Sequence, residues 1–108
     1  MDIADWRKKI DDLDQRLVEM LNERAQAAKE IGALKRNTEM PIYEPERERQ
    51  IFENVRKKNA GPLPDRELVQ IFERIIDVMR KIQHVEIEPN AEAKAAAGES
   101  EFEAEVNE

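Results

Sequence analysis

The chain has 108 residues, a formal net charge of −7 at neutral pH, and equal shares, 40% each, of apolar and charged side chains. This length predicts one small domain, and the composition is typical of amphipathic helices rather than of a sheet-rich fold. The chain has no cysteine and one histidine, so disulfides, cysteine-ligated metals, histidine-bound metals and Ser-His-Asp catalysis are excluded.

Charge and hydropathy also restrict the partners and location of the chain. The excess acidity lies in residues 86–108, which hold eight glutamates against Lys94, while residues 1–85 are neutral overall. A neutral body has no general attraction to nucleic acid or to an anionic membrane. No apolar run reaches the ~18 residues that span a bilayer, and the N-terminus lacks the apolar stretch of a signal peptide. We therefore expect a soluble, cytoplasmic protein that binds no nucleic acid and no membrane.

A very long first helix is predicted. Apolar residues recur at spacings of three and four over Ile3–Leu34, and Asp2 and Asp5 supply capping groups at the start. The helix is expected to end between residues 37 and 40, before Pro41. At 1.5 Å per residue it is about 50 Å long, which exceeds the diameter of a compact monomer of this size. This length predicts packing against a second copy of the chain.

Two shorter helices are predicted to follow, which makes the fold class all-α. Pro45 suits the first position of a helix, and the Asn-Ala-Gly-Pro sequence at residues 59–62 ends it. A third helix opens at Pro64 and Asp65, and its apolar stripe fades after Gln83. The stripe expected to be buried in the second helix comprises Ile51, Phe52 and Val55.

The domain organisation follows from these elements. Residues 1–86 are expected to form a helical domain. The length of the first helix predicts that two copies of this domain pair in a homodimer. Residues 87–108 are rich in Glu and Ala, contain Pro89 and Gly98, and lack a periodic apolar face. They are expected to form an acidic tail that is disordered or loosely helical.

Two cations interrupt the apolar stripe of the first helix. Arg24 falls on the stripe, and Lys35 lies eleven residues later, on almost the same helix face and about 16 Å away by helical rise. A guanidinium on a buried stripe needs anionic partners, so this pair suggests a grip on the two ends of a small dianion. Arg7 lies about 25 Å before Arg24 along the helix axis and cannot share that site within one chain, whereas an antiparallel partner helix would deliver it.

Further polar residues are candidates for the same site. Arg47 and Glu48 lie in the first turn of the second helix, where free N–H groups and the helix dipole favour an anion. Gln83 lies on the apolar side of the third helix, where its amide can donate to an oxygen without the cost of burying a charge. The glutamates around residue 46 fit a helix first turn better than a metal site. The simpler interpretations that stay open are the surface ion pairs Arg7–Asp11 and Arg47–Glu44 and a helix-end role for Gln83.

Four strings spread over residues 6–83 are WRKKIDDLDQRLVEMLNERAQAAKEIGALK, PIYEPERER, NAGPL and IFERIIDVMRKIQ. Together they resemble the all-helical type of chorismate mutase. The resemblance implies an intertwined homodimer of three-helix chains in which each active site receives an arginine from the neighbouring chain. It also implies the [3,3] pericyclic rearrangement of chorismate to prephenate in aromatic amino-acid biosynthesis, which requires no nucleophile, metal or cofactor.

The resemblance further implies roles for individual residues. Its catalytic residues are Lys35 and Gln83, which contact the ether oxygen where negative charge develops, and Arg24, which with Arg47 holds substrate carboxylates. Lys35 also contacts a carboxylate. Arg7 reaches a carboxylate from the partner chain, which is the geometry that the length of the first helix favours.

The remaining substrate-binding positions are carried over in the same way. Glu48 accepts a hydrogen bond from the ring hydroxyl, and the backbone around Glu44 lies nearby. Two positions depart from the family pattern, because Met79 stands where many members have a small polar residue and Glu44 where Asp is common. Met79 bears on one polar contact near the ring carboxylate and leaves the ether-oxygen pair untouched.

Two other functions are compatible with the sequence. An isochorismate pyruvate-lyase, which forms salicylate, shares this fold and much of the arginine set. A non-catalytic helical dimer acting as an adaptor explains the long helix but gives no reason for Arg24 and Lys35 in the apolar stripe. The products formed from chorismate and from isochorismate distinguish these alternatives.

Overall fold

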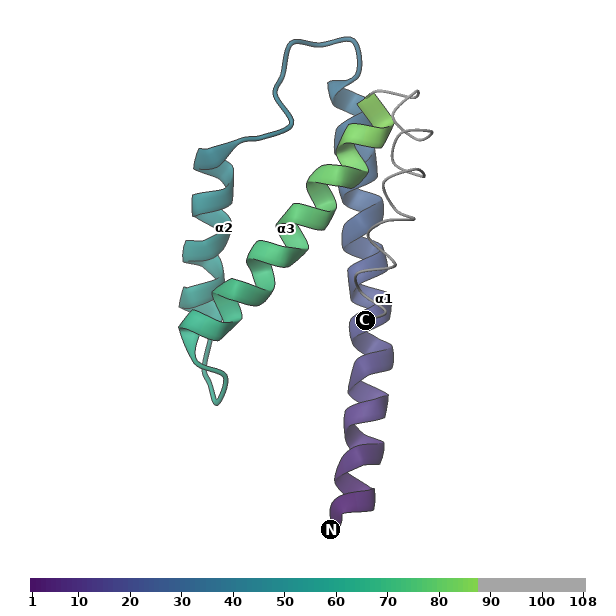
Figure 1. Ribbon diagram of the computed structural model, residues 1–108, viewed down its shortest axis with the longest axis vertical. Coiled ribbons are helices and arrows are strands. Elements are labelled where there is room, and N and C mark those ends of the chain that lie inside the picture. The colour runs from purple at the N-terminus through teal and green to yellow at the C-terminus, as the bar shows by residue number, and fades with distance from the viewer. Residues whose placement is uncertain (88–108) are drawn as a thin grey trace, which may run out of the picture.

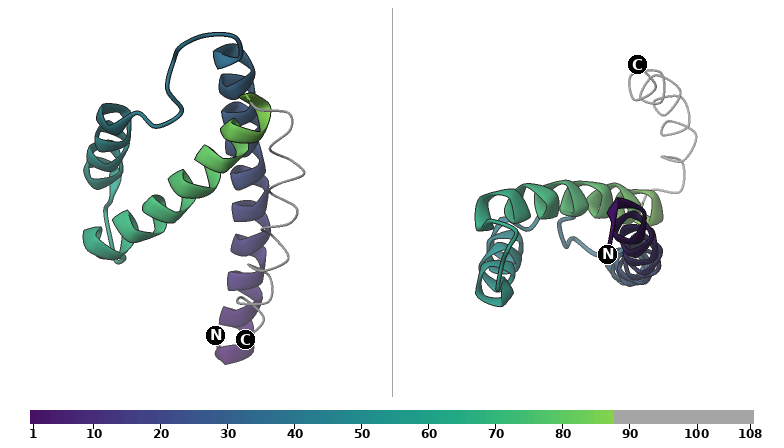
Figure 2. Two further views of the ribbon diagram at one scale, coloured as in Figure 1. Left: turned by 45° about the horizontal axis from the view of Figure 1, so that its top comes forward. Right: turned by 90° about the horizontal axis from the view of Figure 1, so that it is seen from below.

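A computed structural model describes residues 1–87 as three helices, in the order α1 (Ile3–Lys35), α2 (Pro45–Lys58) and α3 (Asp65–Ile87) (Figure 1). The all-α prediction and the very long first helix are thereby confirmed. Figure 2 shows α1 and α2 on the same side of α3, near its opposite ends, so that α3 joins the other two helices. Of the acidic tail expected at residues 87–108, Ile87 is the last residue of α3, and residues 88–108 lie outside the described residues.

The start of α1 follows its sequence signal, whereas its end does not. The Asp5 amide donates to Asp2 Oδ1 at 2.9 Å and the Asp2 amide to Asp5 Oδ2 at 3.0 Å, forming a reciprocal cap. The predicted end at residues 37–40 is wrong, because α1 stops at Lys35. Asn37 takes a left-handed conformation with φ 64°, and the Thr38 amide donates to the Lys35 carbonyl at 3.0 Å. Asparagine tolerates this left-handed conformation. The helix therefore ends several residues before Pro41, the residue that was expected to limit it.

The predicted bounds of α2 are confirmed, but its predicted burial is not. Pro45 is the first residue of α2, and the helix ends one residue before Asn59. The side-chain NH₂ group of Asn59 donates to the Leu63 carbonyl at 2.8 Å and to Asp65 Oδ1 at 2.6 Å. These bonds connect the end of α2 to the start of α3. The expected stripe of Ile51, Phe52 and Val55 is half-buried, and no residue of α2 is buried. A single chain therefore leaves this helix incompletely covered.

The core lies where α3 crosses the second half of α1. The buried residues there are Ala28, Gly32 and Lys35 of α1 and Ile76 and Met79 of α3. A side chain at Gly32 would have its Cβ 2.9 Å from the Glu86 Cβ and 3.0 Å from the Gln83 Cα, so only glycine permits this crossing.

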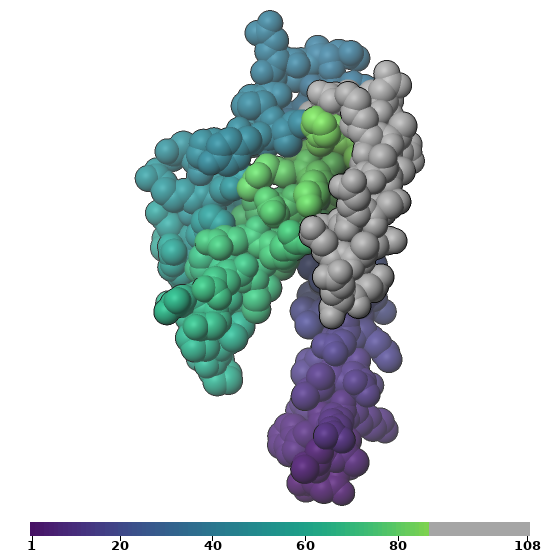
Figure 3. Space-filling model, viewed as in Figure 1, coloured from purple at the N-terminus to yellow at the C-terminus, as the bar shows by residue number. Residues whose placement is uncertain are grey.

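The first half of α1 projects away from the other two helices, as Figure 3 shows. Its apolar face is exposed along its length; Trp6 is 52% and Leu17 50% accessible. Such a face, several turns long, is unusual on a monomer and marks an interaction surface. Within the residues that the structure describes, no helix is long and apolar enough to cross a membrane.

Candidate active site

A cleft of about 730 Å³ lies between α1 and the N-terminal end of α2, with α3 contributing at one side. Its polar lining includes Tyr43, Glu46 and five of the predicted residues: Arg24, Lys35, Glu44, Arg47 and Gln83. A smaller hollow shares four of these and adds Glu48, Met79 and Arg80. The volume lies within the ~300–1,000 Å³ range of small-molecule sites.

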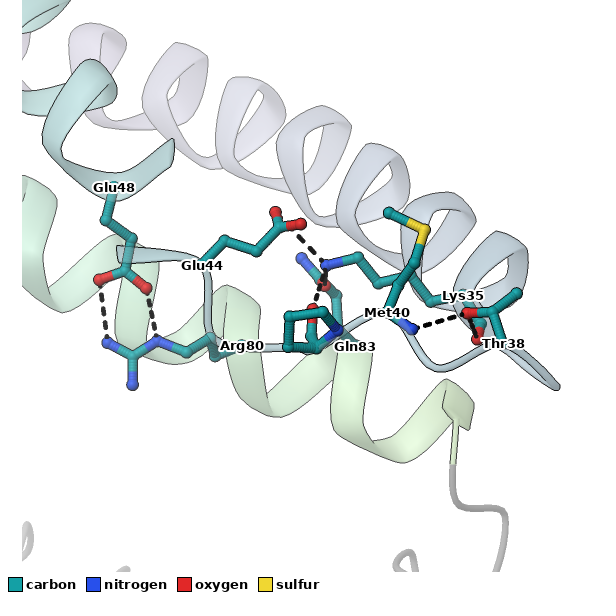
Figure 4. A network of polar contacts seen from close by, with 8 residues as sticks. Lys35, Thr38, Met40, Glu44, Glu48, Arg80 and Gln83 are labelled. Atoms are coloured by element: carbon teal, nitrogen blue, oxygen red, sulfur yellow. Dashed lines mark hydrogen bonds and ion pairs between the residues drawn. The ribbon is translucent and has the colours of Figure 1, made fainter. Parts of the chain in front are cut away.

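Lys35 is the most deeply buried polar residue at the site, with 4% of its surface exposed. Figure 4 shows its ammonium among three acceptors. It donates to the Pro41 carbonyl at 2.9 Å and to Gln83 Oε1 at 3.2 Å, and lies 3.6 Å from Glu44 Oε2. The turn at the end of α1 brings Pro41 and Glu44 back over Lys35, so its charge is compensated despite its burial.

The contact with Lys35 also fixes the Gln83 amide. Because the Gln83 oxygen accepts from Lys35, its NH₂ group remains as a donor. In the described part of the chain no acceptor contacts that NH₂ group, and Gln83 lines the cleft. An ammonium and an amide donor therefore lie together at one end of the cleft.

Two guanidinium groups line the cleft without a carboxylate partner. Arg24 is half-buried, and Arg47 donates to Gln50 Oε1 at 2.9 Å. Burial lowers the pKa of the Arg24 guanidinium from its ordinary value, and the nearby positive charge of Arg47 lowers it further. Neither arginine forms an ion pair with any residue that the structure describes, so the interpretation of Arg47 as a partner of Glu44 is wrong. Bound anions would relieve the repulsion between the two groups.

The three glutamates at the start of α2 each have their own cation. Glu44 pairs with Lys35, Glu46 with Arg49, and Glu48 with Arg80. Because the three carboxylates point to separate partners, they do not converge, and residues 1–87 contain no cluster of acidic or histidine side chains suited to a metal ion.

Arg80 is a site residue that the sequence interpretation missed. Its Nε lies 3.0 Å from Glu48 Oε2, at an angle too poor for a hydrogen bond, and its Nη2 donates to Glu48 Oε1 at 3.4 Å (Figure 4). The guanidinium carbon also lies 5.2 Å from the centre of the Tyr43 ring. The available signal was its position, one turn before Gln83 on a stripe that is otherwise apolar.

Arg7 is the one predicted residue that the single chain brings to neither the cleft nor the smaller hollow. It is exposed in the projecting half of α1 and is absent from the lining of both hollows. It makes no ion pair with Asp11 in the described structure, so that simpler interpretation is wrong as well.

The fold and the site together define an all-helical protein with a cationic cleft suited to a small anionic ligand. Residues 6–84 match the family described as chorismate mutase type II. The chain is 32% identical to a chorismate mutase of Methanocaldococcus jannaschii, covering 75% of this chain and 83% of that protein. It is similar in structure to a chorismate mutase (form II) from Thermus thermophilus, with a TM-score of 0.74 and 28% identity over 76% of this chain and 93% of that one.

The chain belongs to the chorismate mutase type II family. It is also 38% identical, over 76% of its own length, to a bifunctional chorismate mutase/prephenate dehydratase of Aquifex aeolicus. It spans 24% of that relative, and 20% of a protein of the same description from Pseudomonas aeruginosa.

Proposed function

We propose that this protein converts chorismate to prephenate. The observation that carries the proposal is the placement of the buried Lys35 and its partner Gln83 in the same cleft as two arginines that lack a carboxylate partner among the described residues. A dianion needs two such cationic anchors, and a polarised ether oxygen needs donors that are already in place. Family membership supports the same reaction.

Binding is the first task of the site. Chorismate is a flexible dianion, and the reaction requires the folded conformation in which its two reacting carbons meet. Arg24 and Arg47 each offer a planar fork that suits a carboxylate, and binding offsets the repulsion between them. Holding both ends of the substrate removes a conformational part of the barrier.

The chemical step breaks one C–O bond and forms one C–C bond within the same molecule. No group leaves and no proton is transferred, so the protein acts on charge alone. Negative charge grows on the ether oxygen as the C–O bond lengthens, and the Lys35 ammonium and the Gln83 NH₂ group donate to it. These contacts strengthen in the transition state, which is the condition for accelerating the reaction.

The other site residues orient the substrate. Glu48 accepts a hydrogen bond from the ring hydroxyl, and Glu44 holds the Lys35 ammonium through its ion pair at 3.6 Å. Met79 is buried beside the smaller hollow and supplies an apolar wall rather than a polar contact. Together they discriminate among poses of a ligand already held by its carboxylates.

The active protein is a homodimer in this proposal. The exposed apolar face of α1, which includes Trp6 and Leu17, would be covered by the antiparallel α1 of a second copy. That arrangement would carry Arg7 to the partner's cleft, where it supplies a third cation for a substrate carboxylate. The exposure of Arg7 and its distance along α1 from Arg24 support this assignment.

Identifying the products from two substrates tests the proposed reaction. Purified protein is incubated separately with chorismate and with isochorismate, and we expect prephenate from the first. Salicylate and pyruvate from isochorismate, with no prephenate from chorismate, would establish the lyase instead, and no product from either would support a non-catalytic role. Lys35→Met controls for contaminating enzymes and is expected to lose at least about a hundredfold in kcat. Lys29→Met, on the exposed side of the same helix, should retain activity.

A further inference from the structure

One guanidinium joins three segments of the chain beside the cleft. Arg80 of α3 contacts the Glu48 carboxylate of α2 through Nε and Nη2, at 3.0 and 3.4 Å. It lies over the Tyr43 ring of the preceding loop, and its Nη2 is 3.4 Å from Asp77 Oδ1 on its own helix. The arrangement therefore fixes where the Glu48 carboxylate lies.

We propose that Arg80 is a positioning residue, which holds Glu48 away from Arg24 and Arg47 and so keeps these two cations open to a dianionic substrate. The identity of that substrate rests on the proposed function. The competition of Arg80 with Arg24 and Arg47 for the Glu48 carboxylate involves only groups of this chain and is inferred from their contacts.

Competition for the two arginines is built into the site. Glu48, Arg24 and Arg47 line one hollow, and the Glu48 side chain is only 17% exposed. A carboxylate that is largely withdrawn from water must find a cation, because an unpaired buried charge is costly. Besides Arg80, the cations that line this hollow are Arg24 and Arg47, so they are the alternative partners if Arg80 is removed.

An ion pair between Glu48 and either arginine would oppose substrate binding. It would occupy a guanidinium fork and cancel one of the positive charges that attract the dianion. The substrate would then have to break that pair before it could bind. It would also turn Glu48 away from the ring hydroxyl that it is proposed to contact.

A brace between α2 and α3 is the competing explanation of the same contacts. A brace would be lost on removing either partner of the ion pair, so Arg80→Met, Glu48→Gln and the double variant should then have similar effects. Loss of the positioning role matters only while position 48 carries a charge, so adding Glu48→Gln to Arg80→Met should then lower KM. Comparison of the double variant with Arg80→Met separates the two explanations.

The experiment compares kcat and KM for chorismate in the wild type, Arg80→Met, Glu48→Gln and the double variant, each as the full chain. We expect Arg80→Met to raise KM about tenfold, which corresponds to ~1.4 kcal/mol, with kcat changed much less. In the Glu48→Gln background the same substitution should leave KM within about twofold, since no carboxylate remains to compete. Arg80→Lys should restore part of the loss, and Arg74→Met, on the same helix, controls for removal of a surface cation.

A double variant whose KM is no lower than that of Arg80→Met, or an Arg80→Met variant whose KM does not increase, would overturn the proposal. A wild type that forms no prephenate would contradict the proposed function instead. In that case the crystal structure of Arg80→Met tests the positioning role of Arg80. We expect it to place the Glu48 carboxylate within about 4 Å of Arg24 or Arg47. A carboxylate that stays in place or turns to solvent would overturn the inference independently of any activity.

Discussion

At the scale of single residues, the site depends on which groups are already paired before a ligand arrives. Lys35 and Glu44 pair with each other, as do Arg80 and Glu48, while Arg24 and Arg47 have no carboxylate partner in the described structure. The charged groups therefore fall into two sets. The paired residues orient one another, and the two arginines without a carboxylate partner in the described structure are proposed to bind the ligand. An anion entering the cleft meets a positive field that the protein's own carboxylates do not cancel.

Gln83 offers the sharpest test at this scale, because an amide and a carboxylic acid have nearly the same shape. In Gln83→Glu the introduced carboxyl can donate to the ether oxygen only when it is protonated. Its ionised form is favoured above its pKa, which is about 4.3 in the absence of perturbation, and then repels the developing negative charge. We expect kcat of this variant to fall as pH rises through that pKa.

Kinetic measurements between about pH 3.5 and 8.5, a range that includes this pKa, check this expectation. The wild-type amide does not titrate, so the wild-type profile should lack the same decline. Gln70→Glu, at an exposed position of α3 outside the cleft, is the matched control for introducing one carboxyl. A Gln83→Glu variant as active as the wild type at alkaline pH would show that Gln83 does not donate to the reacting oxygen.

The sequence predicts some of these residues better than others. Arg24 and Lys35 interrupt a long periodic pattern in phase with each other. That local signal was sufficient to predict that both line one site. Arg80 interrupts a pattern too, but its role depends on Glu48 and Tyr43, which lie more than thirty residues away in the chain. Contacts of that kind arise from the crossing of elements and have no period in the sequence.

At the scale of elements, the crossing of α1 and α3 brings Lys35 and Gln83 together. Gly32 lies one turn before Lys35 and faces the backbone of Gln83 directly. Arg36 donates to the Glu86 carbonyl at 2.8 Å and pairs with its carboxylate, so α3 is held on both sides of the contact. The distance between Lys35 and Gln83 is therefore set by how closely the two helices approach.

A methyl group at Gly32 should separate the helices. Overpacking typically costs about 1–3 kcal/mol, and the better helix propensity of alanine offsets up to ~1 kcal/mol of that. We expect Gly32→Ala to lower the free energy of unfolding by about 1–2 kcal/mol and to lower kcat, because Gln83 moves away from Lys35.

Chemical denaturation and steady-state kinetics at equal protein concentration check this prediction. Ala33→Leu, at the exposed neighbouring position, should change stability by no more than about 0.5 kcal/mol. Unchanged stability and kcat in Gly32→Ala would mean that the close approach of α3 does not position Gln83.

Helix starts were more predictable than helix ends. Asp2 and Asp5 at α1 and Pro45 at α2 are signals that act within one turn, and both helices begin at them. The end of α1 depends on Asn37 turning the chain so that Pro41 and Glu44 reach Lys35. The position of this turn is set by contacts at the site, so the helix preferences of residues along α1 do not predict it.

At the scale of the whole molecule, one chain leaves too much apolar surface in water. The exposed residues of the projecting half of α1, among them Trp6, Ile10 and Leu17, form one continuous face, and α2 has no buried residue. The length of α1 alone predicted packing against a second copy of the chain, and this exposed face is consistent with that prediction. The antiparallel partner of the proposed dimer would bury that face and fill both clefts from opposite chains.

The central claim is that each active site is assembled from two chains, with Arg7 supplied by the partner. Arg7→Ala and Arg24→Ala variants are each expected to be nearly inactive alone, since both lose a carboxylate anchor. In a heterodimer of the two, one site retains both arginines and the other has neither. Equal mixing with free exchange of chains should therefore restore about a quarter of the wild-type turnover of chorismate.

Rates of prephenate formation are measured before and after mixing, with heterodimers verified by mass spectrometry of differently tagged chains. Mixing either variant with itself provides the matched control and should restore nothing. We predict recovery that rises in proportion to the fraction of heterodimer. Verified heterodimers without any gain in turnover would contradict the account, because each site would then be built from a single chain.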